Sequence, residues 1–347
     1  MAIIWKTFTN IKQLVLIHTE WDKLNQEHNS GCFFTSPKWL LNWVDIYWQD
    51  NWHIYSFAAY DGNELIALLP FYYQQNSKLL TQKNLFFIGQ GEPEQAEVSS
   101  EYLDVLINDN YSKPLLSYCR EKLNHKEFDT FFVRATAATA NVLKAMDTTH
   151  HKLRGTQYQL SPEHWKIELL SKNTRSKIKR TTKLLTSNNA QFAWVANEDK
   201  LSYWEKMSQF HQKRWLKKNC TGAFSQDEFH NFHRNLIDNS TNTAMSALTI
   251  NNQVIAINYY LKDNDNYYFY QSGWDEEKFN HFSPGFALHV WSIKNCDASK
   301  YDFMMGSLND SYKSKFNCEK HALYEISVHY KPIKHVLLKL LQKIFTN

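Results

Sequence analysis

The fold is decided by residues 267–316, which read YYFYQSGWDEEKFNHFSPGFALHVWSIKNCDASKYDFMMGSLNDSYKSKF. The aromatic run 267–272 predicts a strand. Ser283 and Pro284 predict the start of a helix, because serine is a favourable N-cap and proline suits the first helical position. A second strand is expected over 301–305 and a short helix over 309–316. Strands that alternate with helices in this way indicate a mixed α/β sheet, and hence the α+β class.

The residues before this stretch predict a similar arrangement twice. In the second half, helices over 203–217 and 226–238 precede strands over 244–250 and 254–261. In the first half, Ser36 and Pro37 begin a helix that precedes a hairpin with strands 54–60 and 65–73. Both hairpins continue from their turns into the dipeptide Ile-Ala, at Ile66 and at Ile255. Helix and hairpin recur in the same order, which indicates duplication of one α/β unit.

Length and composition fit two globular domains. The chain has 347 residues, more than one ordinary core requires, with 43% hydrophobic and 21% charged residues. The net charge of +4 does not separate an enzyme with anionic ligands from a nucleic-acid binder. We expect an N-terminal domain over 1–155, a C-terminal domain over 156–330 and an amphipathic helix over 331–347.

The cysteines and the chain termini predict a soluble cytoplasmic protein. Five scattered cysteines, without a C-x-x-C pair, argue against a disulfide framework. The first residues lack the features of a signal peptide, and no apolar run is long enough to span a bilayer. The histidines have no cysteine or carboxylate partners at metal-ligand spacing, so no metal site is expected. The basic helix 333–345 is compatible with contact to a membrane surface, although docking on its own domain is the commoner arrangement.

Ser283, Pro284 and Gly285 form a candidate phosphate site. A helix N-terminus presents unpaired amides and the positive end of a dipole, and a glycine there lets a phosphate approach the backbone. An ordinary capped helix is the structural alternative. Downstream, Asp302 lies mid-strand between apolar neighbours, where an unpaired carboxylate is costly to bury, so a functional role is expected for it.

The order of these motifs resembles the GNAT superfamily of acyltransferases. Tyr312 to Phe316 is similar to its Y-x-x-G-F-like motif, with Lys315 at the position of glycine. With the motifs at Phe34–Trp39 and Lys172–Lys183, the chain resembles the CelD-like acetyltransferases, relatives of the FemABX aminoacyltransferases built from two GNAT-like domains. The N-terminal domain would then be a degenerate copy, and the C-terminal one would hold the donor and the catalytic groups.

The resemblance implies an N-acyltransferase that moves an acyl group, acetyl in the simplest case, from CoA to an amine acceptor such as an amino-sugar or polysaccharide precursor. Tyr312 would protonate the leaving thiolate, Asp302 would act as base or orient Lys313, and Lys313 would neutralise charge. Backbone amides beside strand 267–272 would hold the oxyanion. The implied cofactor-binding residues are Ser283, Pro284, Gly285, Phe286, Gly306 and Asn309.

Cationic residues outside this region are candidates for substrate binding. The run Lys172–Lys183 contains no acid, and such a stripe binds phosphate or simply faces solvent. The candidates are Arg175, Lys179, Arg180, Arg214 and Trp215. Two alternatives remain: a FemABX-type transferase that uses aminoacyl-tRNA, whose RNA would meet this stripe, and a non-catalytic protein with the GNAT fold. DNA is not an expected partner.

Overall fold

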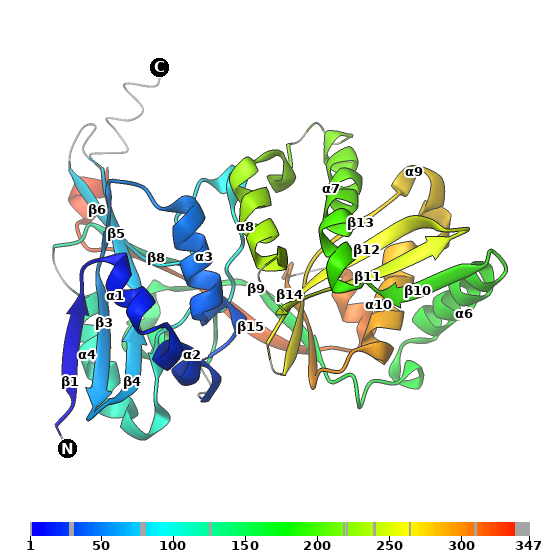
Figure 1. The fold of residues 1–347 in the computed structure, drawn as a ribbon. Coiled ribbons are helices and arrows are strands. Elements are labelled where there is room, and N and C mark those ends of the chain that lie inside the picture. The colour runs from blue at the N-terminus through cyan, green and yellow to red at the C-terminus, as the bar shows by residue number, and fades with distance from the viewer. Residues whose placement is uncertain are drawn as a thin grey trace. The chain divides into compact units, whose positions relative to one another are not determined.

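The computed structural model describes residues 2–27, 31–76, 81–124, 127–217, 219, 221–238, 241–263, 265–308 and 311–336. The chain forms two units, whose elements are labelled in Figure 1. Unit 1 contains residues 1–92, 98–155 and 322–347, and unit 2 contains 93–97 and 156–321.

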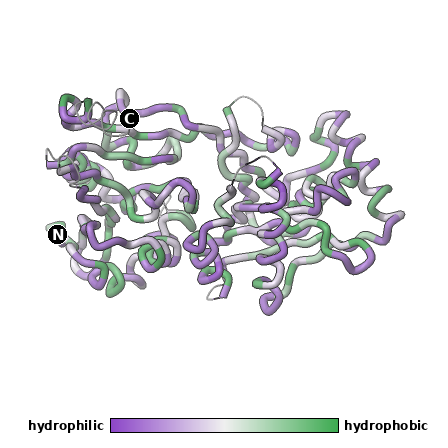
Figure 2. Tube along the Cα trace, turned by 90° about the horizontal axis from the view of Figure 1, so that it is seen from above, coloured by the Kyte–Doolittle hydropathy of each residue, from purple (hydrophilic) through white to green (hydrophobic). Residues whose placement is uncertain are grey.

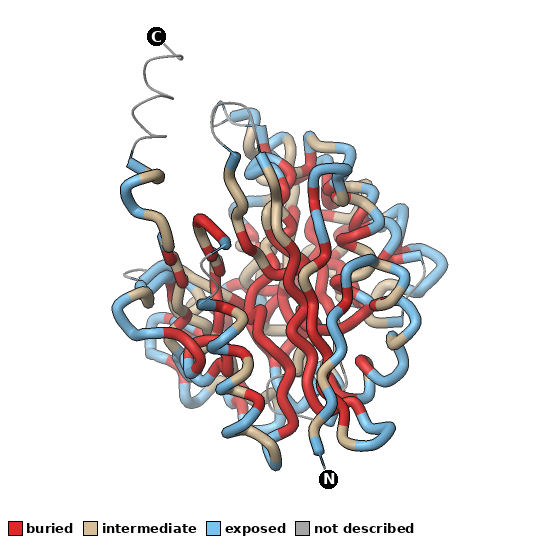
Figure 3. The backbone as a smooth tube through the Cα atoms, turned by 90° about the vertical axis from the view of Figure 1, so that its left-hand side faces the viewer, coloured by how far each residue is buried: buried red, intermediate tan, exposed pale blue. Residues whose placement is uncertain are grey.

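Unit 1 contains two sheets. The smaller has the strand order β1-β3-β4-β7, and the other unit 1 strands follow the order β15-β8-β6-β5-β2. Figure 3 shows the central strands of this unit buried along most of their length. The strands are β1 (Ile4–Phe8), β2 (Trp52–Ile54), β3 (Ser56–Asp61), β4 (Glu64–Leu69), β5 (Phe71–Asn76), β6 (Gln82–Phe87), β7 (Leu106–Ile107), β8 (Thr130–Ala137) and part of β15 (Glu319–His329). The helices are α1 (Ile11–Leu16), α2 (His18–Glu27), α3 (Pro37–Tyr47), α4 (Ser112–Leu123) and α5 (Asn141–Ala145).

Unit 2 is built on the strand order β10-β11-β12-β13-β14-β9. Its apolar core includes Tyr260, Phe269, Tyr301 and Phe303, all buried. The strands are β9 (His151–Leu160, shared with unit 1), β10 (Ala190–Trp194), β11 (Thr243–Ile250), β12 (Gln253–Lys262), β13 (Asn266–Trp274) and β14 (Lys300–Gly306). The helices are α6 (Lys172–Thr186), α7 (Lys200–Leu216), α8 (Asp227–Asp238), α9 (Glu276–Phe279), α10 (Pro284–Asn295) and the 3-10 helix η9 (Tyr312–Phe316).

The two units share local details of strand pairing. In the hairpin β3–β4 the register skips Ile66, and in β11–β12 it skips Ile255, so each has a bulge at the isoleucine that the sequence comparison aligns. Each unit also has a parallel strand pair joined through a helix, β6-α4-β8 and β13-α10-β14. These shared features accord with duplication of one α/β unit.

The expected first hairpin differs from the structure at Pro70. The strand expected over 65–73 is two strands, β4 and β5, which belong to different sheets. Proline has no N–H to donate to a ladder, so the strand is interrupted there. Helix α3 does begin as the sequence predicts, since the Ser36 hydroxyl accepts from the Trp39 amide at 3.3 Å.

The last strand also departs from the expected domain extents. Residues from Ala322 onward group with unit 1, whereas the sequence places residues up to 330 with the second domain. The reason is that β15 pairs antiparallel with β8, from Leu323 opposite Ala137 to His329 opposite Thr130. Most of the expected terminal helix, residues 337–347, lies outside the described residues.

In unit 1 a side chain extends the parallel pair β6–β8. The last paired residues are Phe86 and Phe132. Beyond them the Gln90 side-chain amide donates to the Phe132 carbonyl and accepts from the Arg134 amide at 3.2 Å. A residue of a parallel strand makes the same two bonds to its neighbour, so Gln90 imitates a strand residue opposite Val133.

Hydrophobic segments, in green in Figure 2, are short and interrupted by hydrophilic ones. Among the described residues, no helix is long and apolar enough to cross a membrane.

Asp129 ties residues 331–334 to unit 1 and makes its stability depend on pH. Its carboxylate lies 2.8 Å from the Lys334 ammonium and 3.3 Å from that of Lys331, and accepts from the Lys83 amide at 2.8 Å. Burial alone would raise the pKa of Asp129, but the Lys334, Lys83 and Lys331 contacts outweigh it and lower the pKa. Stability from this group is therefore present above the unfolded-state pKa of about 4 and is lost as the pH falls through the folded-state value.

We expect Asp129→Asn to lower the free energy of unfolding of unit 1 by about 1–3 kcal/mol at neutral pH. Urea unfolding followed from pH 7 to pH 3 should show the difference from wild type shrinking with acidity. Asp50→Asn, at an exposed position, is the control. A difference that stays constant over this pH range would contradict the role of the carboxylate.

Candidate functional site

The candidate site begins where the parallel strands β13 and β14 separate. The two strands pair at Asn266–Lys300, Tyr267–Tyr301 and Tyr268–Asp302 only, although β13 continues to Trp274 and β14 to Gly306. In β13 the register against β12 skips Tyr270, and in β14 Met304 has a φ of 61°. Both strands are therefore bent away from regular pairing just beyond their last shared pair. We call this point of separation the fork.

Aromatic side chains and one histidine line the fork. Phe269 and Phe303 are the first residues beyond the last pair, and their ring centroids lie 6.2 Å apart. The ring of His289, from α10, packs 4.3 Å from Phe269 and 4.9 Å from Phe303. Phe316 of η9 completes this cluster, with its ring 5.5 Å from His289. The base of the fork is thus closed by an apolar wall with one polar ring in it.

The N-terminus of α10 differs from the expected serine cap. Ser283 has a φ of 48°, in the left-handed region, and its side chain makes no capping hydrogen bond. The expectation that the Ser283 hydroxyl caps α10 was therefore wrong. The left-handed backbone turns the chain sharply out of the preceding 3-10 turn, Asn280–Phe282, into Pro284.

Gly285 and Phe286 lie in the first turn of α10, close to aromatic and basic side chains. A Cβ at Gly285 would lie 3.6 Å from the Trp274 ring, an ordinary contact. The Phe286 ring packs 5.1 Å from that of Phe316, and the Lys177 ammonium lies 4.5 Å from its centroid. Burial lowers the pKa of Lys177, with smaller contributions from Lys315 and Arg180, so three cations gather at this end of the helix. Positive charge and amides together favour an anion there.

Lys313 and Asp302 both bind the distorted end of β14. The Lys313 ammonium donates to the carbonyl oxygens of Phe303 and, at 2.6 Å, Met305. The fully buried Asp302 carboxylate accepts from the Met304 amide at 2.6 Å and from the Gln157 side chain at 2.6 Å. These contacts hold the Met304 bend from both sides.

Gly306 follows at the end of the same strand. A Cβ on it would lie 2.8 Å from the Ser311 hydroxyl and 2.8 Å from the Tyr158 ring. The expected cofactor-binding residue Asn309 lies outside the described residues.

Tyr312 stands at the mouth of the fork. It is 46% exposed, and its ring lies 6.0 Å from that of His289. Desolvation raises the pKa of Tyr312, while the Arg214 guanidinium opposes that rise. The phenol therefore keeps its proton at neutral pH.

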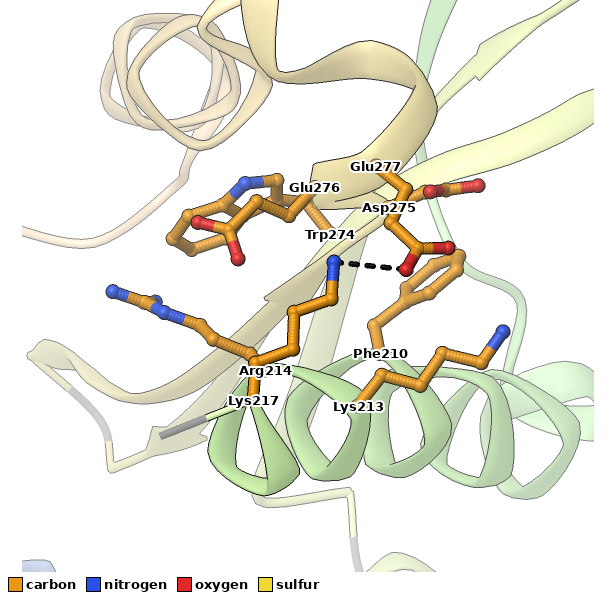
Figure 4. A pocket seen from close by; sticks show the side chains of 8 residues that line it. All are labelled: Phe210, Lys213, Arg214, Lys217, Trp274, Asp275, Glu276 and Glu277. Carbon is orange, nitrogen blue, oxygen red and sulfur yellow. Dashed lines mark ion pairs between the residues drawn. The ribbon is translucent and has the colours of Figure 1, made fainter. Parts of the chain in front are cut away.

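Arg214 and Trp274 form the wall at the end of β13, in the pocket of Figure 4. The Arg214 guanidinium lies 4.5 Å from the Trp274 ring centroid, and the Lys217 ammonium pairs with Glu277 at 2.8 Å. Trp215 does not join this wall: its indole N–H donates to His211 at 2.9 Å, and its ring would contact a Cβ on Gly222 at 3.2 Å. These contacts pack Trp215 within α7 and against the following turn.

The basic run of α6 divides into separate roles. Arg175 donates to the carbonyl oxygens of Leu170 and Glu168, and so closes the turn before α6. Lys179 and Arg180 are exposed. Lys177, rather than the stripe at three- and four-residue spacing, reaches Phe286.

Sequence reasoning missed His289, Trp274 and Lys177. Of these three, only Trp274 could have been suspected from the sequence, because it lies nine residues before Ser283 in the same strand-helix segment. Among the described residues, no group of His, Cys, Asp or Glu side chains is placed to hold a metal ion.

Comparison with known proteins gives a domain match within the chain and a fold for the whole of it. Residues 172–314 match a family model described as acetyltransferase (GNAT) domain. No curated protein matches. Among solved structures, FemX is similar over 97% of this chain and 99% of its own, with 10% identity and a TM-score of 0.62.

Two further structures share the fold. The C-terminal domain of a putative lysylphosphatidylglycerol synthetase from Agrobacterium fabrum is similar over 90% of this chain and 92% of its own, with 10% identity and a TM-score of 0.53. L-PGS from Bacillus licheniformis is similar over 88% of this chain and 96% of its own, with 9% identity and a TM-score of 0.50. The expected α+β class with two GNAT-like units is confirmed, and residues 172–314 match the kind of domain that the sequence resemblance implies.

The contacts of Lys313 predict a structural effect of its loss. We expect Lys313→Met to lower the free energy of unfolding of unit 2 by about 1.5–3 kcal/mol, because carbonyl oxygens of β14 lose a charged donor. Lys315→Met, an exposed lysine on the same 3-10 helix, should leave it nearly unchanged. Urea unfolding of both variants makes the comparison. A Lys313→Met variant with full stability and lost turnover would instead place Lys313 in the chemistry.

Proposed function

We propose that this chain, an acyltransferase with a GNAT acetyltransferase domain over residues 172–314, transfers an acyl group from coenzyme A to an amine. The observation that carries the proposal is the fork between β13 and β14, with α10 beginning beside it. Such a fork admits the narrow arm of coenzyme A, and the N-terminus of α10 favours the phosphates to which that arm is attached.

The donor would lie with its pyrophosphate on the first turn of α10. The amides of Gly285 and Phe286 point toward that end of the helix, and Lys177 adds positive charge there. The thioester carbonyl would lie at the β13 bulge around Tyr270, where the strand's backbone amides are displaced from regular pairing. Met304, bent outward under Lys313 and Asp302, keeps β14 away from this space.

The reaction is acyl transfer by direct attack. The unprotonated amine nitrogen bonds to the thioester carbon, and the oxyanion is held by backbone amides of β13. The carbon–sulfur bond then breaks, Tyr312 gives its proton to the thiolate, and the proton lost by the amine restores Tyr312. The products are an amide and free CoA. Arg214, over Trp274, would meet an anionic group of a substrate at the mouth of the fork.

The acceptor class rests on the family resemblance: an amino-sugar or another amine intermediate of polysaccharide synthesis, acylated in the cytoplasm. A second candidate, transfer from aminoacyl-tRNA, is favoured by the exposed cations of α6. These residues are Lys172, Lys179, Arg180 and Lys183. Binding of tRNA that weakens steeply with salt, together with no stabilisation by acyl-CoA, would support that candidate.

Donor binding is tested by thermal unfolding with acetyl-CoA and longer acyl-CoAs, since a ligand specific for the native state raises Tm. We expect Gly285→Ala to retain the Tm of the free protein, because its Cβ makes only an ordinary contact, and to weaken donor binding about tenfold or more by obstructing the phosphate. Lys177→Met should weaken binding as well, whereas Lys183→Met should not. If the Tm of the wild type were unchanged by every acyl-CoA, acyl-CoA would be excluded as the donor.

Proton donation by Tyr312 is tested separately. We expect Tyr312→Phe to lower kcat about 10²–10⁴-fold and to change donor Kd little, because the phenolic proton is needed only in the chemical step. Single-turnover kinetics with acetyl-CoA and a panel of amines measures both quantities. Unchanged turnover in Tyr312→Phe would show that another group protonates the thiolate.

A further inference from the structure

A chain of buried polar groups runs behind the fork in unit 2. His289 Nδ1 lies 2.8 Å from the Tyr301 hydroxyl, which donates to the Tyr260 hydroxyl at 3.2 Å. Tyr260 is in turn held by Asn258, whose side-chain amide donates to it at 3.0 Å, and by Ser246 at 3.1 Å. His289 is the end of this chain that reaches the fork.

The direction of the Tyr301–Tyr260 hydrogen bond indicates the tautomer of His289. A tyrosine hydroxyl has one proton, and that of Tyr301 is directed to Tyr260. His289 Nδ1 must therefore carry a proton and donate it to Tyr301. In a neutral imidazole the other nitrogen, Nε2, then has a free lone pair and is an acceptor.

His289 is neutral at ordinary pH and holds its acceptor at the fork. Burial, and to a smaller extent the Lys313 ammonium, lower the pKa of His289 to about 3. The two ring nitrogens point to different sides, so Nε2 faces away from Tyr301, within the cluster formed by Phe269, Phe303 and the Tyr312 ring. A nitrogen of this kind accepts a hydrogen bond but does not retain a proton, which makes it a binding group rather than a general base.

Unit 1 indicates what kind of group belongs at such a fork. There the space beyond the last β6–β8 pair is taken by an amide, the side chain of Gln90. Its helix α4 has Cys119 five residues after Pro114, as His289 follows Pro284 by five in α10. Cys119 is buried, and its thiol is a weak acceptor.

We propose that His289 binds the acyl donor, accepting through Nε2 a hydrogen bond from an amide N–H in the donor's arm, and that Tyr301 is the positioning residue that sets this tautomer. This proposal rests on the proposed function, since CoA carries secondary amides between its phosphates and its thioester. It makes His289 a determinant of donor specificity, selecting amide-bearing thioesters over simple ones.

The tautomer is tested in the free protein, independently of any substrate. Long-range ¹H–¹⁵N correlation spectra of ¹⁵N-histidine-labelled protein, with His289 assigned from the His289→Gln variant, should show a neutral ring protonated at Nδ1. A ring protonated at Nε2 would overturn the proposal, because that nitrogen would then be a donor.

Donor specificity is tested with acetyl-CoA and with a short acetyl thioester that has no amide. We expect His289→Leu to raise the KM for acetyl-CoA about tenfold, as for the loss of one hydrogen bond, with kcat and the reaction of the short thioester nearly unchanged. Tyr301→Phe should raise the same KM several-fold by releasing the tautomer.

Tyr267→Phe is the matched control. Tyr267 is the cross-strand partner of Tyr301, and its hydroxyl donates to Asp297 at 2.8 Å rather than to His289. Equal effects of Tyr267→Phe and Tyr301→Phe, or an unaltered KM in His289→Leu, would overturn this proposal alone. Failure of wild type to bind or use acetyl-CoA would overturn the proposed function, and this inference with it.

Discussion

The site in unit 2 depends on how early β13 and β14 stop pairing. Parallel strands gain a hydrogen bond at each step, so two long neighbouring strands that pair at three positions must be held apart. The force that does this is electrostatic and local: an ammonium on the carbonyl oxygens of residues 303 and 305, and a buried carboxylate on the amide of residue 304. These two charged side chains stabilise a backbone bend that isolated β propensity disfavours. The fork opens at that bend, beside the Phe303 and His289 rings.

In the structure Asp302 and Lys313 bind the backbone of β14, whereas their positions in the sequence indicate groups that take part in the reaction. An aspartate in a run of apolar residues indicates a function because burying it unpaired is costly. In the structure the Asp302 carboxylate accepts hydrogen bonds from β9 and from β14, and these bonds offset the free-energy cost of burying it. The bond to the Met304 amide also stabilises the bend of β14. A buried charged residue in a sequence can perform chemistry or hold a strand in place, and the sequence pattern is the same in both cases.

The sequence predicts much of the secondary structure because the signals are local. The Ser-Pro start of α3, the hairpin turns and the strand-helix-strand order after residue 267 are each contained within a short segment. The departures come from non-local or steric effects. Pro70 divides one expected strand between two sheets, and Ser283 adopts a left-handed backbone in place of a cap. Pairing of β15 with β8 joins residues almost two hundred positions apart, which no periodicity reveals.

The site residues that sequence reasoning missed are those whose roles come from partners on other elements of the fold. His289 becomes distinctive through Tyr301 and Tyr260, and Lys177 through Phe286, over a hundred residues away. A lone histidine in an apolar helix, or one lysine among several, carries no such information by itself. Hydrogen-bond direction, in particular, exists only once the fold has brought the hydroxyl groups together.

Gln90 has a consequence for the strand edge of unit 1. Where β6 and β8 stop pairing, the Phe132 carbonyl and the Arg134 amide need new partners. One amide side chain supplies both hydrogen bonds, so this strand edge is satisfied by the chain itself and without a ligand. Unit 1 thus contains in its own sequence the kind of group that, in our proposal, a bound donor supplies to unit 2.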